Sequence, residues 1–174
     1  MRWIFGYGSL MWRPGFAFEA RQEARLYGYH RSFCVYSHVH RGTPEKPGLV
    51  LGLDRGGSCR GMAYGVSDSQ MAATLDYLRA REQATAVYLE RELPVNLEDG
   101  TRVRATTYLV DRAHGQYAGR LGLEDQLRLV RQGMGQSGAN PDYVKGTVRH
   151  LEEMGIVEGP LHDLLKRLGS SDDA

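Results

Sequence analysis

Apolar residues recur at helical spacing between Ser67 and a carboxylate fifteen residues later. Met71, Leu75 and Leu78 share one face of a helix that begins at Ser67, and Glu82 continues that face four residues after Leu78. An unpaired carboxylate on an inward face costs several kcal/mol, about as much as a small domain's whole stability, so it must be compensated or protonated. The pattern therefore predicts a chemical role for Glu82.

A plainer interpretation of the same helix stays open. The helix can end before Glu82, and this carboxylate then faces water. In both interpretations Arg79 and Arg81 point away from the inward face.

Helical patterns return in the last third of the chain. One helix carries the apolar series Leu123, Leu127, Val130 and Met134, and a short last helix carries Leu161, Leu164, Leu165 and Leu168. Between them, Asn140 and Pro141 suit a helix cap and a first-turn proline, and Gly155 can end that helix.

The remaining apolar runs predict β-strands separated by turns. A strand pair joined through Asp54–Gly57 and another joined through Glu98–Gly100 are predicted hairpins. The predicted strands are Arg2–Tyr7, Arg25–Ser37, Leu49–Leu53, Cys59–Val66, Ala86–Val95 and Arg102–Val110. The pattern predicts an α+β fold: a mixed, mostly antiparallel sheet or small barrel with flanking helices.

Length and composition favour one domain that acts on a small molecule. The chain has 174 residues, of which 41% are hydrophobic, so we expect a single domain over residues 1–169 and a disordered tail over 170–174. A formal net charge of +1 gives no field for nucleic acid or an anionic membrane. Without a signal peptide or a long apolar run, we expect a cytoplasmic protein, and we expect a monomer.

Cysteine and histidine give little support for a metal or a disulfide framework. Cys34 and Cys59 lack CxxC spacing and are expected to be small buried apolar residues. His38 and His40 share one face of an extended strand, but a first shell needs three or four ligands. We expect no metal and no cofactor, and a structural or loop-anchoring role for these histidines.

The segment Gly6–Leu10 leaves the first predicted strand and contains two glycines. Successive backbone N–H groups here can converge on one point and bind an anion. The segment is neither a dinucleotide fingerprint nor a P-loop, because Met11 replaces the third glycine and the lysine is missing. A plain tight turn is the alternative.

Several motifs in the expected order resemble the ChaC-type γ-glutamylcyclotransferase family. The resemblance covers nearly the whole chain. The motifs are Phe5–Phe16, His40–Glu45, Gly57–Tyr64, Tyr77–Glu82, Gly138–Val144 and Leu151–Ile156.

The resemblance implies cleavage of a γ-glutamyl peptide, characteristically glutathione, into 5-oxoproline and Cys-Gly. The family's acid/base maps onto Glu82, its substrate loop onto Tyr7, Gly8, Ser9 and Leu10, and a pocket tyrosine onto Tyr143. The substrate's own α-amine attacks the γ-carbonyl, so no cofactor is implied. One departure follows Glu82, where the residues at 83–86 differ from the family's aromatic or glycine-rich step.

The loop after His40 is a candidate lid over the Cys-Gly end of the substrate. It contains two prolines and two glycines between His40 and Gly48. Arg41 or Arg60 can pair with the terminal carboxylate of the substrate.

Three other functions compete with glutathione cleavage. The same reaction can act on other γ-glutamyl amines or amino acids. The loop at Tyr7–Leu10 can instead serve a non-catalytic module that binds a γ-glutamyl metabolite, and His38 with His40 can belong to a metal hydrolase.

Overall fold

The computed structural model describes residues 1–82 and 86–170. The chain divides into two compact units, each built from two segments. The first unit comprises Met1–Arg31 and Leu53–Asp111, and the second comprises Ser32–Gly52 and Arg112–Ala174. The predicted tail, apart from residue 170, lies outside the described residues, as do residues 83–85.

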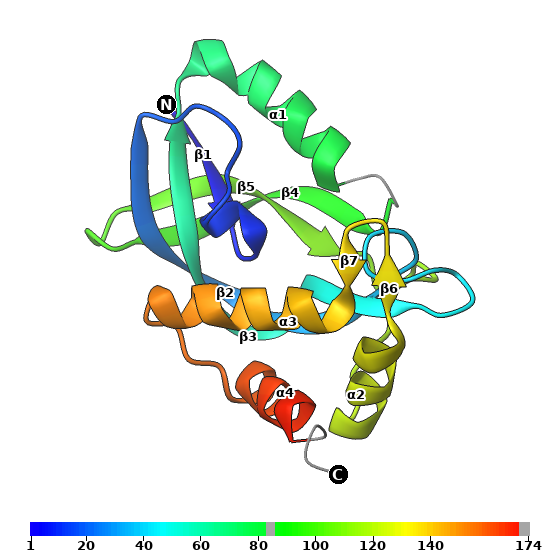
Figure 1. Ribbon diagram of the computed structural model, residues 1–174. Coiled ribbons are helices and arrows are strands. Elements are labelled where there is room, and N and C mark those ends of the chain that lie inside the picture. The colour runs from blue at the N-terminus through cyan, green and yellow to red at the C-terminus, as the bar shows by residue number, and fades with distance from the viewer. Residues whose placement is uncertain (83–85, 171–174) are drawn as a thin grey trace. The chain divides into compact units, whose positions relative to one another are not determined.

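The five long strands form a closed barrel in the order β1-β3-β2-β4-β5 (Figure 1). Their bounds are β1 Arg2–Gly6, β2 Ala20–Ser37, β3 Gly48–Val66, β4 Tyr88–Leu97 and β5 Arg102–Val110. Strand β1 pairs antiparallel with β3 and parallel with β5, and Ile4 and Phe5 on it are fully buried. The predicted α+β class with a small, mostly antiparallel barrel is confirmed.

The hairpin predicted at Glu98–Gly100 is present. Strands β4 and β5 pair antiparallel from Tyr88 opposite Val110 to Asn96 opposite Arg102. The Gly100 N–H donates to the Leu97 carbonyl over 3.0 Å, and Gly100 has a φ of +85°. An Asp-Gly step suits this left-handed turn position.

The hairpin predicted at Asp54–Gly57 is wrong, because β3 is one strand of 19 residues. Gly56 and Gly57 have φ values of +107° and +68°, and His30 Nδ1 on β2 lies 2.9 Å from the Gly56 carbonyl oxygen. Glycines with positive φ occur both in tight turns and in local bends of a strand. Here they lie within one strand that continues in the same direction, so no hairpin forms.

Helix α1 (Asp68–Glu82) has the inward face that the spacing predicts. Met71 and Leu78 are buried, Leu75 is half-buried, and Thr74 is also buried. The helix includes Glu82, so the interpretation in which it ends before that residue is wrong.

The second unit contains the other long helices (Figure 1). Their buried residues include the predicted Leu127, Val130, Leu161 and Leu164. The elements are α2 Leu123–Gln132, β6 Met134–Gly135, β7 Gly138–Ala139, α3 Asn140–Glu153 and α4 Gly159–Gly169.

Met134 does not continue the apolar face of α2. It lies on β6 with 60% of its surface exposed. The helix ends before Gly133, where a Cβ atom would lie 2.5 Å from the Arg41 carbonyl oxygen. The backbone of Arg41 packs closely against Gly133, just after the end of the helix. The spacing of apolar residues does not reveal this contact, so it places the helix end too late.

Asn140 is not the helix cap that the sequence predicts. Ala139 occupies the cap position of α3, and the fully buried Asn140 amide instead pairs with β3. Its Oδ1 accepts from the Leu49 N–H and its Nδ2 donates to the Leu49 carbonyl, both over 2.8 Å. The side chain thus substitutes for a neighbouring strand at the start of β3.

Two further observations concern the remaining expectations. Cys34 and Cys59 are buried free cysteines, as predicted. Within residues 1–82 and 86–170, no helix is long and apolar enough to cross a membrane.

Replacing Asn140 with alanine should destabilise the protein. The change leaves the buried N–H and carbonyl of Leu49 without these partners, at about 1–3 kcal/mol for each unsatisfied group. We expect Asn140→Ala to lower the free energy of unfolding in urea by about 2–4 kcal/mol. The control is Asn96→Ala at an exposed position of β4, expected to change it by less than about 0.5 kcal/mol. Equal stabilities of the two variants would contradict this role of Asn140.

Candidate active site

Glu82 lies in the last turn of α1, on the helix face that Leu78 buries. Its side chain is only 20% exposed. Burial raises the pKa of the Glu82 carboxyl above its ordinary value, and the positive charge of Arg81 opposes that shift in part. A carboxyl with a raised pKa is suited to exchange protons near neutral pH.

Arg81 is a neighbour of this carboxyl that the sequence interpretation missed. Its Nε lies 3.8 Å from Glu82 Oε1, and its Nη2 donates to the Ser9 hydroxyl over 2.6 Å. Nη1 donates to the Arg13 carbonyl over 2.7 Å and to the Tyr77 hydroxyl over 3.0 Å. The expectation that Arg81 points away from the site is wrong, because a long side chain can reach across the end of its helix.

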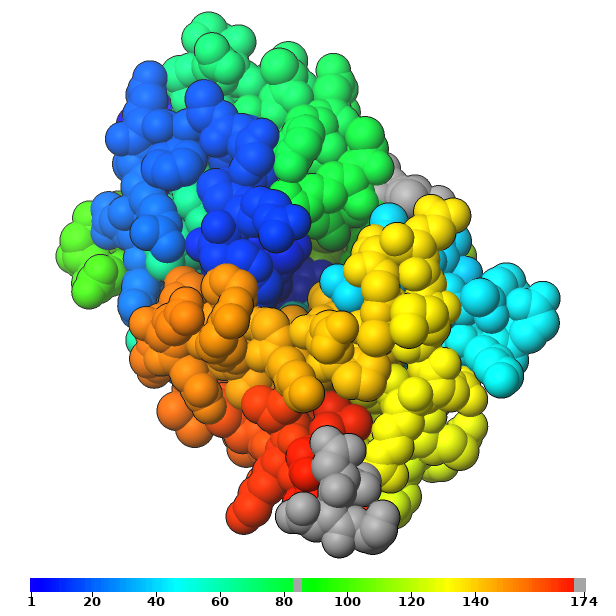
Figure 2. Space-filling model, in the orientation of Figure 1, coloured from blue at the N-terminus to red at the C-terminus, as the bar shows by residue number. Residues whose placement is uncertain are grey.

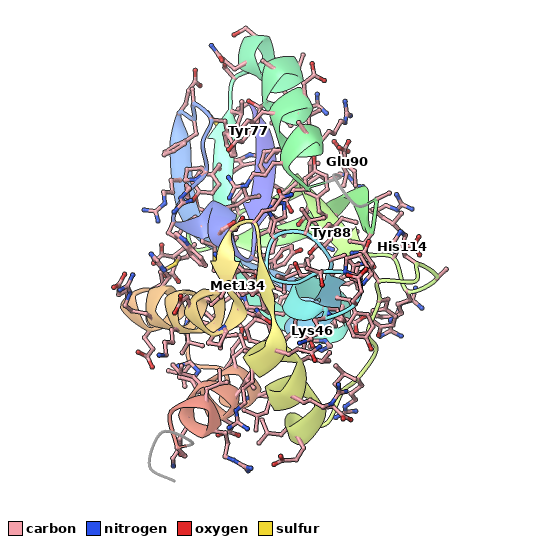
Figure 3. All side chains as sticks on the ribbon, turned by 45° about the vertical axis from the view of Figure 1, so that its right-hand side comes forward. Lys46, Tyr77, Tyr88, Glu90, His114 and Met134 are labelled. Atoms are coloured by element: carbon pink, nitrogen blue, oxygen red, sulfur yellow. The ribbon has the colours of Figure 1, made fainter. Side chains whose placement is uncertain are left out.

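Arg79 holds the same helical turn to strand β4. Its Nε and Nη2 donate to the two carboxylate oxygens of Glu90 over 3.0 and 2.9 Å. Glu90 is labelled in Figure 3. The buried Tyr108 hydroxyl also donates to Glu90 over 3.0 Å. Burial raises the pKa of the Tyr108 phenol, and the carboxylates of Glu90 and Glu82 raise it further.

The predicted substrate loop follows β1. After Gly6 the chain passes through Tyr7 and Gly8 into a short 3-10 turn, η1 (Ser9–Met11). Tyr7 and Leu10 are buried, whereas Gly8 is half-buried and Ser9 is exposed. Figure 2 shows the N-terminal segment and the end of α1 side by side on the surface of the first unit, where Arg81 bonds to Ser9.

The carbonyl groups of this loop are bonded to side chains. The Arg31 Nε donates to the Tyr7 carbonyl over 2.6 Å, and the Tyr64 hydroxyl lies 2.8 Å from the carbonyl oxygens of both Leu10 and Met11. Among the described residues, none accepts a hydrogen bond from the N–H of Gly8, Ser9 or Leu10. Backbone donors without a protein acceptor are one of the features that an anion-binding loop needs.

Two other predicted site residues meet in the second unit. The Arg41 guanidinium carbon lies 5.4 Å from the centre of the Tyr143 ring, and Arg41 Nη1 donates to the Ala139 carbonyl over 3.1 Å. The Tyr143 hydroxyl accepts from the Leu51 N–H over 3.1 Å. The alternative arginine, Arg60, belongs to the first unit and pairs with Glu23 over 2.8 Å.

Both ends of the candidate lid are hydrogen-bonded within the second unit. The N–H groups of Gln136 and Ser137 donate to the carbonyls of Val39 and His40, and Gln132 Nε2 donates to the Pro47 carbonyl. The tip at 43–46 is exposed. The loop is thus anchored by hydrogen bonds at both ends.

His40 is used in the same anchoring network. Its Nδ1 lies 3.0 Å from the Ser137 hydroxyl. Across the described ranges, no three His, Cys, Asp or Glu residues are grouped so that they could hold a metal ion.

A family model described as ChaC-like protein matches residues 2–170. The chain belongs to this ChaC-like family. The departure from the family pattern after Glu82 lies, apart from residue 86, outside the described residues.

Curated relatives agree with membership of the ChaC-like family, and a crystal structure shares its fold. The "Glutathione-specific gamma-glutamylcyclotransferase" of Escherichia coli (strain K12) is 34% identical over 94% of this chain and 71% of its own. The "Glutathione-specific gamma-glutamylcyclotransferase 1" of Danio rerio is 35% identical over a match that covers 82% of this chain and 74% of the relative. A crystal structure of a yeast γ-glutamyl cyclotransferase specific to glutathione matches with a TM-score of 0.87 at 21% identity, over 97% and 96% of the two chains.

In this ChaC-like chain, Glu82 should lower stability as the pH rises. Its folded pKa lies above its ordinary value of 4.5, so folding favours the protonated form. Burying the charged form therefore costs stability. This cost is absent below the pKa of Glu82 in the unfolded chain and grows as the pH rises to its pKa in the folded protein. Its size is about 1.4 kcal/mol for each unit by which the two pKa values differ. Relative to wild type, Glu82→Gln should therefore become more stable between pH 4 and pH 7.

Urea unfolding of both proteins at several pH values measures this difference. The matched control is Glu98→Gln, at an exposed carboxylate on the β4–β5 turn. A stability difference between Glu82→Gln and wild type that stays constant from pH 4 to pH 7 would contradict the raised pKa.

Proposed function

We propose that this chain is a γ-glutamylcyclotransferase that cleaves glutathione into 5-oxoproline and Cys-Gly. The observation that carries the proposal is the largely buried Glu82 carboxyl, which the Arg81 side chain connects to the loop at Ser9. The curated relatives named for this reaction support glutathione as the substrate.

In the proposed reaction, Glu82 transfers a proton from the attacking amine to the leaving amine, and a second proton follows. Glu82 takes a proton from the α-ammonium of the γ-glutamyl group, and the freed amine attacks the γ-carbonyl carbon. A new C–N bond closes the five-membered lactam, and the bond to the cysteine nitrogen breaks as Glu82 returns the proton to that leaving nitrogen. The ring nitrogen gives up its second hydrogen as a proton, which the released amine of Cys-Gly accepts to become an ammonium. A bent substrate gives this intramolecular attack a high effective molarity, and the protons balance without a cofactor.

The loop supplies the proposed site for negative charge. The N–H groups of Gly8, Ser9 and Leu10 bind the α-carboxylate of the substrate or the oxyanion that develops on its γ-carbonyl, and Tyr7 lines the loop. One preorganised donor of this kind contributes about 3 kcal/mol to transition-state stabilisation. The inward bonding of the Tyr7 and Leu10 carbonyls supports this role.

Tyr143 and Arg41 are two further proposed contacts with the substrate. Tyr143 positions the substrate with its phenol, and Arg41 pairs with the terminal carboxylate of the Cys-Gly part. Their packing against each other supports a shared role, because the ring of Tyr143 restricts the guanidinium of Arg41.

We also propose that residues 1–169 form one catalytic domain that works as a monomer in the cytoplasm. The family match spans residues 2–170 and therefore includes both units. The two buried free cysteines suit a reducing compartment.

Product analysis of the purified protein tests the proposed reaction. Wild type incubated with reduced glutathione should form 5-oxoproline and Cys-Gly in equal amounts, measured by mass spectrometry. Glu82→Gln should keep glutathione binding but lose at least 100-fold in turnover, because the amide cannot accept and return the proton. Glu98→Gln is the control and should retain wild-type turnover.

The outcomes separate the competing functions. An active Glu82→Gln protein would remove Glu82 from the mechanism. Absence of both products with wild type would contradict glutathione as the substrate. A panel of γ-glutamyl amines and γ-glutamyl amino acids would then distinguish another cyclotransferase substrate from a binding module.

A further inference from the structure

Arg31 is a buried cation that the proposed proton transfer does not use. It lies on β2 within the first unit, and only 3% of its surface is exposed. Its Nε donates to the Tyr7 carbonyl and its Nη2 to the Arg60 carbonyl, both over 2.6 Å, and Nη2 lies 3.7 Å from the Met11 sulfur. A buried guanidinium requires good hydrogen-bond geometry, so these short bonds constrain both carbonyls.

The bond to Tyr7 also determines the direction of the next N–H group. The structure contains no cis peptide bond among its described residues, so the Tyr7 carbonyl and the Gly8 N–H point in opposite directions across one planar peptide. Because the carbonyl points to Arg31, the Gly8 N–H points away from Arg31. Rotation of this peptide would reverse that donor.

The positive charge of Arg31 affects the same peptide electronically. A carbonyl that accepts a charge-assisted hydrogen bond polarises its amide, which makes the attached N–H a stronger donor. The Tyr64 hydroxyl near the Leu10 and Met11 carbonyls and Arg81 at the Ser9 hydroxyl hold the rest of the loop. Arg31 is therefore the side chain that fixes the peptide preceding Gly8.

We propose that Arg31 is a positioning residue that locks the Tyr7–Gly8 peptide so that the Gly8 N–H can bind an anionic group of the γ-glutamyl substrate. The inference rests on the proposed function, because the loop is the substrate-binding element there. Arg31 acts through the peptide and does not itself contact the substrate.

Replacement of Arg31 by lysine tests this role while keeping a positive charge. One ammonium replaces the two guanidinium nitrogens that hold the carbonyls of Tyr7 and Arg60, so the peptide loses its lock. We expect Arg31→Lys to lower kcat/KM for glutathione by about 10-fold to 100-fold. A crystal structure of this variant should show the Tyr7 carbonyl rotated away from residue 31.

Two controls separate positioning from general stability. Arg25→Met removes another β2 arginine, which bonds to the Ser58 hydroxyl over 3.2 Å, and should retain kcat/KM within about twofold. Arg31→Met, if it folds, should lose at least as much activity as Arg31→Lys. Neither lysine nor methionine at position 31 should move the pH dependence of kcat, because Glu82 is unchanged.

A wild-type peptide orientation or a wild-type kcat/KM in Arg31→Lys would overturn the proposal. A shifted pH profile in that variant would also overturn it, because the effect would then act on the acid/base. If the wild-type protein does not cleave glutathione, the proposed function fails. The orientation of the Tyr7 carbonyl in Arg31→Lys would still decide whether Arg31 fixes the Tyr7–Gly8 peptide.

Discussion

The site depends on one constraint, the burial of the Glu82 carboxyl at the end of α1. A carboxylate in this position is costly, and its raised pKa expresses that cost. Arginines on the same turn hold the helix end from two directions, with Arg79 bonded to Glu90 on β4 and Arg81 bonded to Ser9. These bonds connect the turn that carries Glu82 to β4 and to the loop after β1.

The loop after β1 complements this carboxyl through its backbone. Buried donors on β2 and β3, Arg31 and Tyr64, hold its carbonyls, which leaves N–H groups available for negative charge. In the proposed reaction the substrate supplies its own nucleophile, Glu82 transfers a proton, and these backbone donors bind negative charge. The barrel fixes both parts, since β1 leads into the loop and α1 follows β3.

Local patterns predicted much of the fold, and long-range contacts explain what they missed. The face of α1 and the Gly100 turn follow from spacing and turn chemistry. Asn140 was misassigned because its partner, Leu49, lies 91 residues away in the sequence. Arg31 was missed although it alternates with the buried Phe33 and Val35, because a polar residue on a strand is usually assigned to the exposed face.

The central claim is that Glu82 carries the proton, and NMR titration of glutamate side-chain carboxyl carbons tests it most directly. We predict one carboxyl that titrates above the ordinary value of 4.5, is missing in Glu82→Gln and titrates still higher in Arg81→Gln, where the opposing charge is gone. Arg128→Gln, which removes an exposed arginine of α2, is the control and should leave this resonance unmoved. Titration of every glutamate at or below its ordinary pKa would contradict the account.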